Sequence, residues 1–168
     1  SRKYYSSQLQ RILGHEIEGQ HIILTVGRLI ERKGMHWFVE NVMTEMDKDV
    51  IYLIAGEGPM RETIEKIIEQ KGLGSRVFLL GQVSEADLHI LYAAADIFVQ
   101  PNIPVEGDME GFGLVVLEAG ASGLPVIASR LEGLMEAISD GDNGEFVTPC
   151  CAEEYVQRIK SLLGDKET

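Results

Sequence analysis

Short apolar segments rich in β-branched residues alternate along the chain with longer segments of helical spacing, and this alternation constrains the fold most strongly. Parallel strands need a crossover connection, usually a helix, so a regular strand–helix order predicts a parallel sheet with helices on both faces. The predicted fold is therefore α/β, a Rossmann-like six-stranded parallel sheet. The predicted strands cover residues 21–26, 50–55, 77–80, 96–99, 126–128 and 145–147.

A predicted helix follows each strand. Apolar residues three and four apart mark the first of them, Pro59 is well placed to open the second, and Ser84 is a good N-cap for the third. A helical lead-in occupies residues 1–20, and the sheet domain occupies residues 21–168. The predicted helices cover residues 35–46, 59–71, 85–94, 113–121, 132–138 and 152–163.

The charge balance excludes some partners. Fifteen basic against twenty-seven acidic residues give a net charge of -12, which argues against general binding to nucleic acid or anionic membranes. No apolar run approaches the roughly 18 residues of a spanning helix, and no secretory leader is visible. The adjacent Cys150 and Cys151 cannot form an ordinary loop-closing disulfide. We therefore expect a soluble, cytoplasmic chain without a transmembrane segment.

Three basic residues, Arg28, Arg32 and Lys33, follow the first predicted strand. In a sheet of this kind, ligands bind outside the carboxyl ends of the strands. Arginine offers a planar fork for phosphate oxygens, lysine offers a mobile point charge, and Gly34 would let a phosphate approach a helix start. A phosphate site and a solvated loop whose charges pair with Glu31 are both consistent with this pattern.

Glu110 and Glu118 are eight positions apart. Eight helical residues would span about 12 Å, more than the roughly 5 to 9.5 Å between the carboxylates of a glycosidase pair. We interpret the two glutamates as hydroxyl acceptors at opposite ends of an extended polar ligand, with Gly111 and Gly113 leaving backbone amides open between them. Because Glu118 lies in an apolar stretch, we expect its carboxylate to be either buried or ligand-bound.

Two further patterns predict turns and no cofactor. The segment 56–61 begins like a dinucleotide fingerprint, but Arg61 stands at the third glycine position, so we predict a tight strand-to-helix turn. Paired aspartates at 47/49 and 140/142 precede strands at the edge opposite the ligand loops, where turn chemistry explains them. We therefore expect no metal site.

Together these residues resemble the retaining GT-B glycosyltransferases of family four, a group that includes glycogen synthases and many mannosyltransferases. The resemblance covers about residues 22–163, the donor-binding half of such enzymes. The matching segments, in order, are Gly27-Arg28-Leu29 with Lys33-Gly34, Gly56-Glu57-Gly58-Pro59, Leu80-Gly81-Gln82-Val83-Ser84, residues 91–99, Glu110/Glu118, Ala119, Gly123, residues 125–129, Glu136 and residues 141–144.

The resemblance implies a sugar donor activated by UDP, GDP or ADP, and transfer of a hexose to an acceptor. Arg28 and Lys33 would neutralise the donor diphosphate and stabilise the leaving nucleotide. Glu110 would hold sugar hydroxyls, together with the backbone of Gly111, Phe112 and Gly113. In such enzymes fixed cations and helix amides perform the work of a metal.

The resemblance also implies a nucleotide site. The amides of Leu114 and Val115 would lie near the phosphates, and Glu118 would accept hydrogen bonds from the ribose hydroxyls. The backbone at Val83 would contact the base. Gly27 would be a further nucleotide-binding residue.

An N-terminal acceptor-binding domain in cis completes the cleft in the family, so we expect the chain alone to be inactive. We expect a cytoplasmic location, and the full-length enzyme could still bind peripherally to a membrane. A non-catalytic nucleotide- or sugar-binding module that acts with a separate acceptor-domain partner is the alternative, and half of a GT-B epimerase matches less well. The residues specify neither the base, the sugar nor the acceptor.

Overall fold

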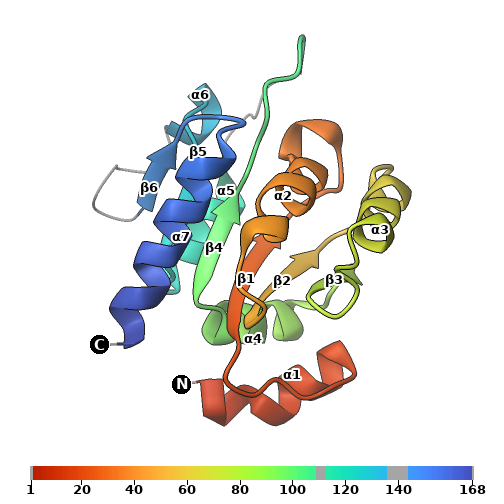
Figure 1. Cartoon of the computed structure of the whole chain (residues 1–168). Coiled ribbons are helices and arrows are strands. Elements are labelled where there is room, and N and C mark those ends of the chain that lie inside the picture. Colours follow the sequence, from red (N-terminus) through yellow and green to blue (C-terminus); the bar gives the residue numbers. More distant parts are fainter. Residues whose placement is uncertain (1, 109–112, 136–143, 168) are drawn as a thin grey trace.

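The structure, a computed structural model, describes residues 2–108, 113–135 and 144–167. Six parallel strands form one sheet in the order β3-β2-β1-β4-β5-β6, which confirms the predicted Rossmann-like α/β fold (Figure 1). The strands are β1 His21–Val26, β2 Val50–Ala55, β3 Val77–Gly81, β4 Ile97–Gln100, β5 Val126–Ser129 and β6 Gly144–Val147.

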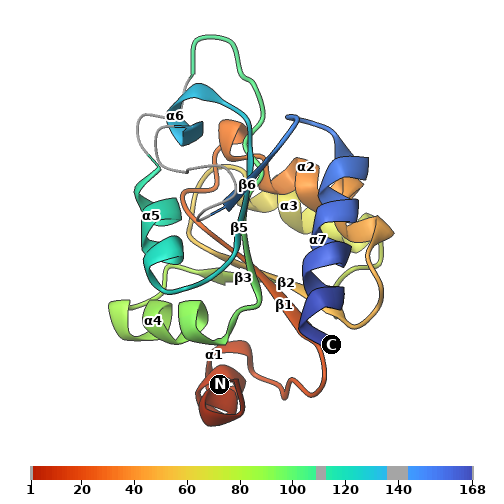
Figure 2. The same ribbon diagram turned by 90° about the vertical axis from the view of Figure 1, so that its left-hand side faces the viewer.

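Helices cover both faces of the sheet, with α2, α3 and α7 on one face and α1, α4 and α5 on the other (Figures 1 and 2). This arrangement is what right-handed crossovers between parallel strands produce. The helical segments are η1 Arg2–Tyr5, α1 Ser6–Leu13, η2 Glu31–Lys33, α2 Met35–Asn41, η3 Met43–Glu45, α3 Arg61–Gln70, α4 Glu85–Ala94, α5 Leu114–Ala121, α6 Glu132–Met135 and α7 Ala152–Glu167, where η denotes a 3₁₀ helix.

Successive strand residues point to opposite faces and build two separate cores. Ile23 and Tyr52 pack with the face of α2, α3 and α7. Leu24 and Phe98 pack with the face of α1, α4 and α5. Because both faces are covered, the strands are mostly apolar on both sides rather than alternating between apolar and polar residues.

The strand order reverses between β1 and β4, which pair with each other in the middle of the sheet. Strands β2 and β3 extend the sheet on one side of this pair, and β5 and β6 extend it on the other. A buried polar chain crosses this point: the Tyr52 hydroxyl donates to Thr25 Oγ1 at 2.7 Å, and Thr25 Oγ1 donates to the Val99 carbonyl at 2.6 Å. Burial raises the pKa of Tyr52, so its hydroxyl remains a donor. Ligands of such folds bind outside the strand ends at this switch point.

Three helices differ from their predicted bounds by two residues or more, and one of them, α7, runs to Glu167 rather than to residue 163. The predicted helix 35–46 is α2 followed by the 3₁₀ helix η3, with a break at Val42. The helix predicted to open at Pro59 begins at Arg61, because residues 58–61 form a tight turn in which Arg61 N donates to the Gly58 carbonyl at 3.2 Å. The Met60 N–H, which has no acceptor within the helix, donates to the Leu29 carbonyl at 2.9 Å.

The N-terminal helix α1 packs on α4. Its Leu9 is buried in the core that α4 and α5 share, and Arg11 pairs with Asp87 of α4 at 2.7 Å. The helical lead-in is therefore a layer of the same core. In the described part of the chain, no helix is long and apolar enough to cross a membrane.

Candidate functional site

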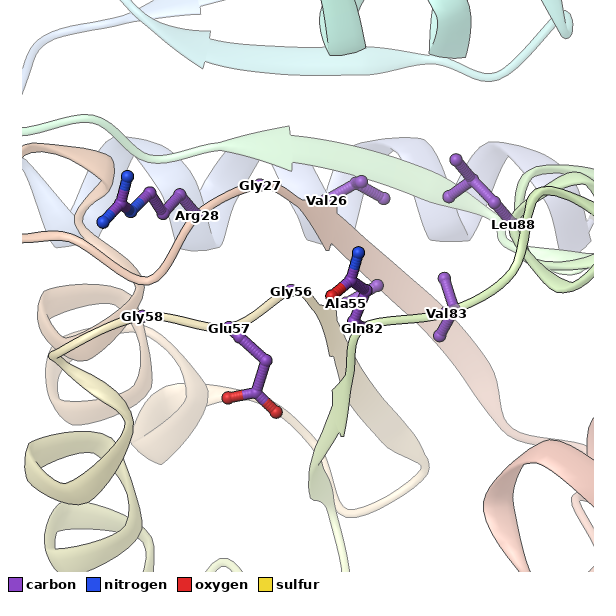
Figure 3. A pocket seen from close by; sticks show the side chains of 10 residues that line it. All are labelled: Val26, Gly27, Arg28, Ala55, Gly56, Glu57, Gly58, Gln82, Val83 and Leu88. Atoms are coloured by element: carbon purple, nitrogen blue, oxygen red, sulfur yellow. The ribbon is translucent and has the colours of Figure 1, made fainter.

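An open cavity of about 510 Å³, the sheet-end cavity, lies at the carboxyl ends of β1, β2 and β3 (Figure 3). The Arg28 side chain lies at one end of the cavity, and Val83 and Leu88 lie at the other. This arrangement suits an extended ligand with a charged end and an apolar end. The lining residues are Val26, Gly27, Arg28, Ala55, Gly56, Glu57, Gly58, Gln82, Val83 and Leu88.

Glycines at the end of β2 let two of the cavity's loops touch. A Cβ on Gly56, whose φ is +146°, would lie 1.9 Å from the Gly27 carbonyl oxygen, and a Cβ on Gly58 would lie 2.4 Å from that of Leu29. Backbone hydrogen bonds join the same loops, from Gly27 N to Ala55 O and from Leu29 N to Glu57 O, both 3.0 Å long. The predicted tight turn is confirmed, and its residues also form the cavity floor.

Within the cavity lining, one acidic group already has a cationic partner. Glu57 Oε1 accepts from Arg61 Nη1 at 2.9 Å, and Arg61 Nε also donates to Glu65 at 2.8 Å. The side chain of Glu57 points away from Arg28 (Figure 3). Arg28 is exposed at the rim, so an anionic ligand would meet its guanidinium first.

Lys33 lies beside the same loop. It is 8% exposed, and its Cε and Cδ lie 3.8 and 3.9 Å from the point where a Cβ on Gly27 would stand. The fold thus brings the stem of Lys33 against the loop that carries Arg28. At Gly34 the outcome differs from the expected phosphate approach, because its missing Cβ makes room for the Pro101 carbonyl, 1.9 Å from the Cβ position.

The third basic residue of this loop holds a different segment. Arg32 Nε donates to Asp108 Oδ1 at 3.0 Å, and its carbonyl accepts from Ile103 N at 3.0 Å. Arg32 thus ties its own loop to the loop after β4. Arg32 is therefore a structural cation, and Arg28 and Lys33 remain the candidates for a ligand.

Helix α5 begins with unused amides. Val116 N and Leu117 N donate to the carbonyl of Gly113, and no described residue accepts from the N–H of Leu114 or Val115. Gly113 has no side chain to cap them, so the helix start can bind an anion. Leu114, Val115 and Lys33 are outside the lining of the sheet-end cavity.

Glu110, Gly111 and Phe112, predicted to bind the sugar, lie outside the described residues. Because α5 begins at Leu114, the helical rise assumed between Glu110 and Glu118 applies only to the second half of that spacing.

Glu118 is exposed, so its carboxylate is not buried, and the ligand-bound alternative remains a prediction. Its Oε2 accepts a hydrogen bond from the Tyr92 hydroxyl at 3.2 Å. Burial and the nearby Glu118 charge raise the pKa of Tyr92, which keeps the hydroxyl protonated as a donor. This contact joins α4 to α5 beside the candidate site.

Sequence analysis missed Leu88 and Tyr92, although a signal was present. The two residues are four positions apart in α4, so they lie on one face of the helix, about 6 Å apart along its axis. Leu88 lines the sheet-end cavity and Tyr92 contacts Glu118. One helix face therefore leads from the apolar end of the cavity to the predicted ribose acceptor.

The described residues contain no group of three or more His, Cys, Asp or Glu side chains that could hold a metal ion. Of the paired aspartates, Asp49 lies 3.8 Å from His21 Nε2, and Asp140 and Asp142 lie outside the described residues.

The chain is similar to known proteins in both sequence and fold. A family model, Glycosyl transferases group 1, matches residues 10–168. The uncharacterized glycosyltransferase MJ1607 of Methanocaldococcus jannaschii is 34% identical over 149 residues, covering 88% of this chain and 37% of the relative. The chain thus spans little more than a third of that relative's length.

Solved structures share the fold over nearly the whole chain. Anabaena Alr3699/HepE, in complex with UDP and glucose, has a TM-score of 0.82 at 27% identity, covering 98% of this chain and 44% of that one. The C-terminal domain of the group 1 glycosyl transferase LpcC from Francisella tularensis has a TM-score of 0.79 at 26% identity, covering 99% and 84%. This chain belongs to the group 1 glycosyl transferases.

Proposed function

We propose that the chain is the donor-binding domain of a retaining glycosyltransferase, which takes a sugar from a nucleoside diphosphate and passes it to an acceptor. The observation that carries the proposal is the sheet-end cavity, which has Arg28 at one end and Val83 and Leu88 at the other. HepE, which shares this fold, has been solved with UDP and glucose. A uridine nucleotide is therefore the first ligand to test.

In this proposal the nucleotide lies along the carboxyl ends of β1 to β3. The base packs near Val83 and Leu88, where backbone groups and an apolar side chain are available. The ribose hydroxyls donate to Glu118, which Tyr92 holds from the neighbouring helix. The diphosphate faces Arg28, Lys33 and the first amides of α5.

The transfer step needs charge stabilisation more than it needs a strong nucleophile. The bond between the sugar C1 and the phosphate oxygen breaks and a bond forms between C1 and the acceptor oxygen. The nucleoside diphosphate leaves with additional negative charge, and its oxygen can take up the proton that the acceptor hydroxyl loses. Arg28, Lys33 and the amides of Leu114 and Val115 are fixed positive groups that would stabilise the leaving group. Glu110 and the backbone of residues 111–113 would orient the sugar.

An acceptor-binding domain in cis would form the opposite wall of the cleft. The chain spans 37% of the length of MJ1607, which leaves room in such a protein for a second domain of similar size. We therefore propose that this chain binds donor and does not transfer sugar by itself. A module that acts with a separately encoded partner is the alternative, and a cytoplasmic location stays a prediction.

The test is a calorimetric titration of the chain with UDP, GDP and ADP, repeated with Arg28→Gln and with Lys66→Gln as a matched control. Lys66 is exposed on α3, away from the cavity, so its replacement removes the same charge from another surface. We expect saturable binding of one nucleotide and a Kd raised about tenfold in Arg28→Gln, because a charge-assisted hydrogen bond is lost. Equal Kd values in both variants would contradict the proposed diphosphate site.

A further inference from the structure

The segment after β4, residues 101–108, extends past the carboxyl ends of the strands (Figures 1 and 2). We call it the β4 loop; its first two residues are buried and its last three are exposed. A tight turn closes its outer part, where Asp108 N donates to the Val105 carbonyl at 3.0 Å. Gly107 has a φ of +77° in this turn, a conformation that suits glycine. The turn fixes the backbone from which the carboxylate of Asp108 extends.

The β4 loop contacts the backbone on both sides of Lys33. On one side, Arg32 Nε donates to Asp108 Oδ1 at 3.0 Å, and the Arg32 carbonyl accepts from Ile103 N, also at 3.0 Å. On the other side, Gly34 lies so close to the first carbonyl oxygen of the loop that a Cβ would stand 1.9 Å from it. Lys33 therefore lies between two residues that are each fixed to the β4 loop.

The ion pair between Arg32 and Asp108 is better shielded than an ordinary surface pair. The Arg32 side chain is 19% exposed and that of Asp108 is 49% exposed. Fully exposed pairs contribute little, but a short charge-assisted hydrogen bond from a largely buried guanidinium is stronger. The Arg32 backbone is already bonded to the β4 loop, so the carboxylate of Asp108 adds a second point of attachment on the side chain.

The side chain of Lys33 is ordered by packing. It is 8% exposed, and its Cε lies 3.8 Å from the point where a Cβ on Gly27 would stand. A lysine side chain has many rotamers, so ordering it when a ligand binds costs free energy. A stem that already packs against the loop after β1 has lost much of that freedom beforehand, which favours binding. This packing depends on the backbone at Lys33, which the β4 loop holds.

We propose that Asp108 is a positioning residue for the donor diphosphate, because through Arg32 it holds Lys33 in place. This role rests on the proposed donor site. A purely electrostatic role for Asp108 predicts the opposite effect: its negative charge near an anion site would repel the ligand, so removing it would tighten binding. A positioning role predicts that removing Asp108 weakens binding, and the sign of the change therefore separates the two roles.

The test is an NMR titration of the ¹⁵N-labelled chain with UDP and with uridine, which has the base and ribose but no phosphate. Asp108→Ala should raise the Kd for UDP at least about threefold, the cost of one orienting hydrogen bond, and should leave the Kd for uridine unchanged. Glu106→Ala is the matched control, because it removes the same charge from an exposed position of the same loop, and it should not raise the Kd for UDP. Asp108→Asn keeps an acceptor for Arg32 and should restore most of the affinity.

Two further measurements test the route from Asp108 to the ligand. In a Lys33→Gln background, Asp108→Ala should change the Kd for UDP less than about 1.5-fold, because the residue through which Asp108 acts is gone. The Ile103 amide, which donates to the Arg32 carbonyl, should exchange its hydrogen at least about fivefold faster in Asp108→Ala than in wild type. In Glu106→Ala it should exchange at the wild-type rate.

A wild-type chain that does not bind UDP would overturn the proposed function, and the role of Asp108 with it. If wild type binds UDP, any of four results would overturn the role of Asp108 alone. They are an unchanged or lower Kd for UDP in Asp108→Ala, equal weakening for UDP and uridine, fully additive effects of Asp108→Ala and Lys33→Gln, or a wild-type exchange rate at Ile103 in Asp108→Ala.

Discussion

Gly56 lets the loops after β1 and β2 lie against each other below the proposed nucleotide. Its φ of +146° is one that side chains rarely adopt, and a Cβ there would overlap the Gly27 carbonyl oxygen. The shape of the sheet-end cavity therefore depends on a missing side chain as much as on those present.

We expect Gly56→Ala to lower the free energy of unfolding by about 2 to 4 kcal/mol, through backbone strain and overlap together. Gly72→Ala is the matched control, because Gly72 also has a positive φ, +65°, but has no atom within 4 Å of its Cβ position. Denaturant unfolding measures both. Similar losses in the two variants would mean that the contact between the loops is unimportant.

His36 gives stability a pH dependence. Burial lowers its pKa, against the smaller opposing effect of Glu31 and Glu40, and its Nδ1 is buried without a hydrogen-bond partner in the described part. The folded chain thus binds the proton less readily than the unfolded chain. The stability that the neutral ring contributes is present above the unfolded pKa of about 6.5 and is lost as pH falls toward the folded value.

We therefore expect His36→Gln to flatten the decline in unfolding free energy between about pH 7 and pH 5. His89→Gln, at an exposed position of α4, serves as control and should leave that decline unchanged. Denaturant unfolding curves of wild type and both variants, collected across this pH range, measure the decline. An identical pH profile in wild type and His36→Gln would contradict the assignment.

At the scale of elements, the contact between α4 and α5 ties one end of the cavity to the predicted ribose site. Tyr92 is almost fully buried and anchored in the core, whereas Glu118 is exposed. The buried Tyr92 hydroxyl therefore restrains the exposed carboxylate of Glu118. Tyr92 is a positioning residue in this account, because it acts through Glu118.

We expect Tyr92→Phe to raise the Kd for UDP about threefold to tenfold, the cost of one hydrogen bond that orients Glu118. The same variant should bind 2′,3′-dideoxyuridine diphosphate as well as wild type does, because that ligand has no ribose hydroxyls for Glu118. Calorimetry with both ligands distinguishes a role in positioning Glu118 from a purely structural role. Equal weakening for both would indicate a merely structural role for Tyr92.

Apolar spacing predicted the strands to within about a residue but did not predict where helices break. Met35, Phe38, Val42 and Met46 are all buried, as helical spacing requires, yet α2 ends at Asn41. A 3₁₀ turn keeps the same side chains inward, so spacing alone cannot separate it from a continuing helix. Just before α3, the Met60 N–H donates to the Leu29 carbonyl of a distant loop, a contact that the local sequence does not contain.

In the candidate site too, some residues could be predicted from the sequence, whereas others depend on tertiary contacts. Arg28 was predicted from its place after the first strand and Val83 from the family resemblance, and the topology brings both to one cavity. Tyr92 was not predicted, because its contact with Glu118 depends on α4 packing beside α5. The pair of Arg32 with Asp108 was not predicted either, because the two residues are 76 positions apart.

At the scale of the whole molecule, the proposed donor site is an open cavity at one end of a single sheet. An opposing domain would be needed to exclude water and to place an acceptor hydroxyl at the sugar. We expect the chain alone to bind UDP but to release no measurable nucleotide from UDP-glucose in the presence of sugar acceptors. Coupled detection of UDP release tests this, and steady turnover by the chain alone would contradict a divided active site.

The central claim is that a nucleotide occupies the carboxyl ends of β1 to β3, and mapping UDP by amide chemical shifts tests it most directly. The account predicts saturable shifts at Gly27, Arg28, Val83 and the start of α5, with none along α7. Shifts confined to α7, or no shifts in these loops at saturating UDP, would contradict it.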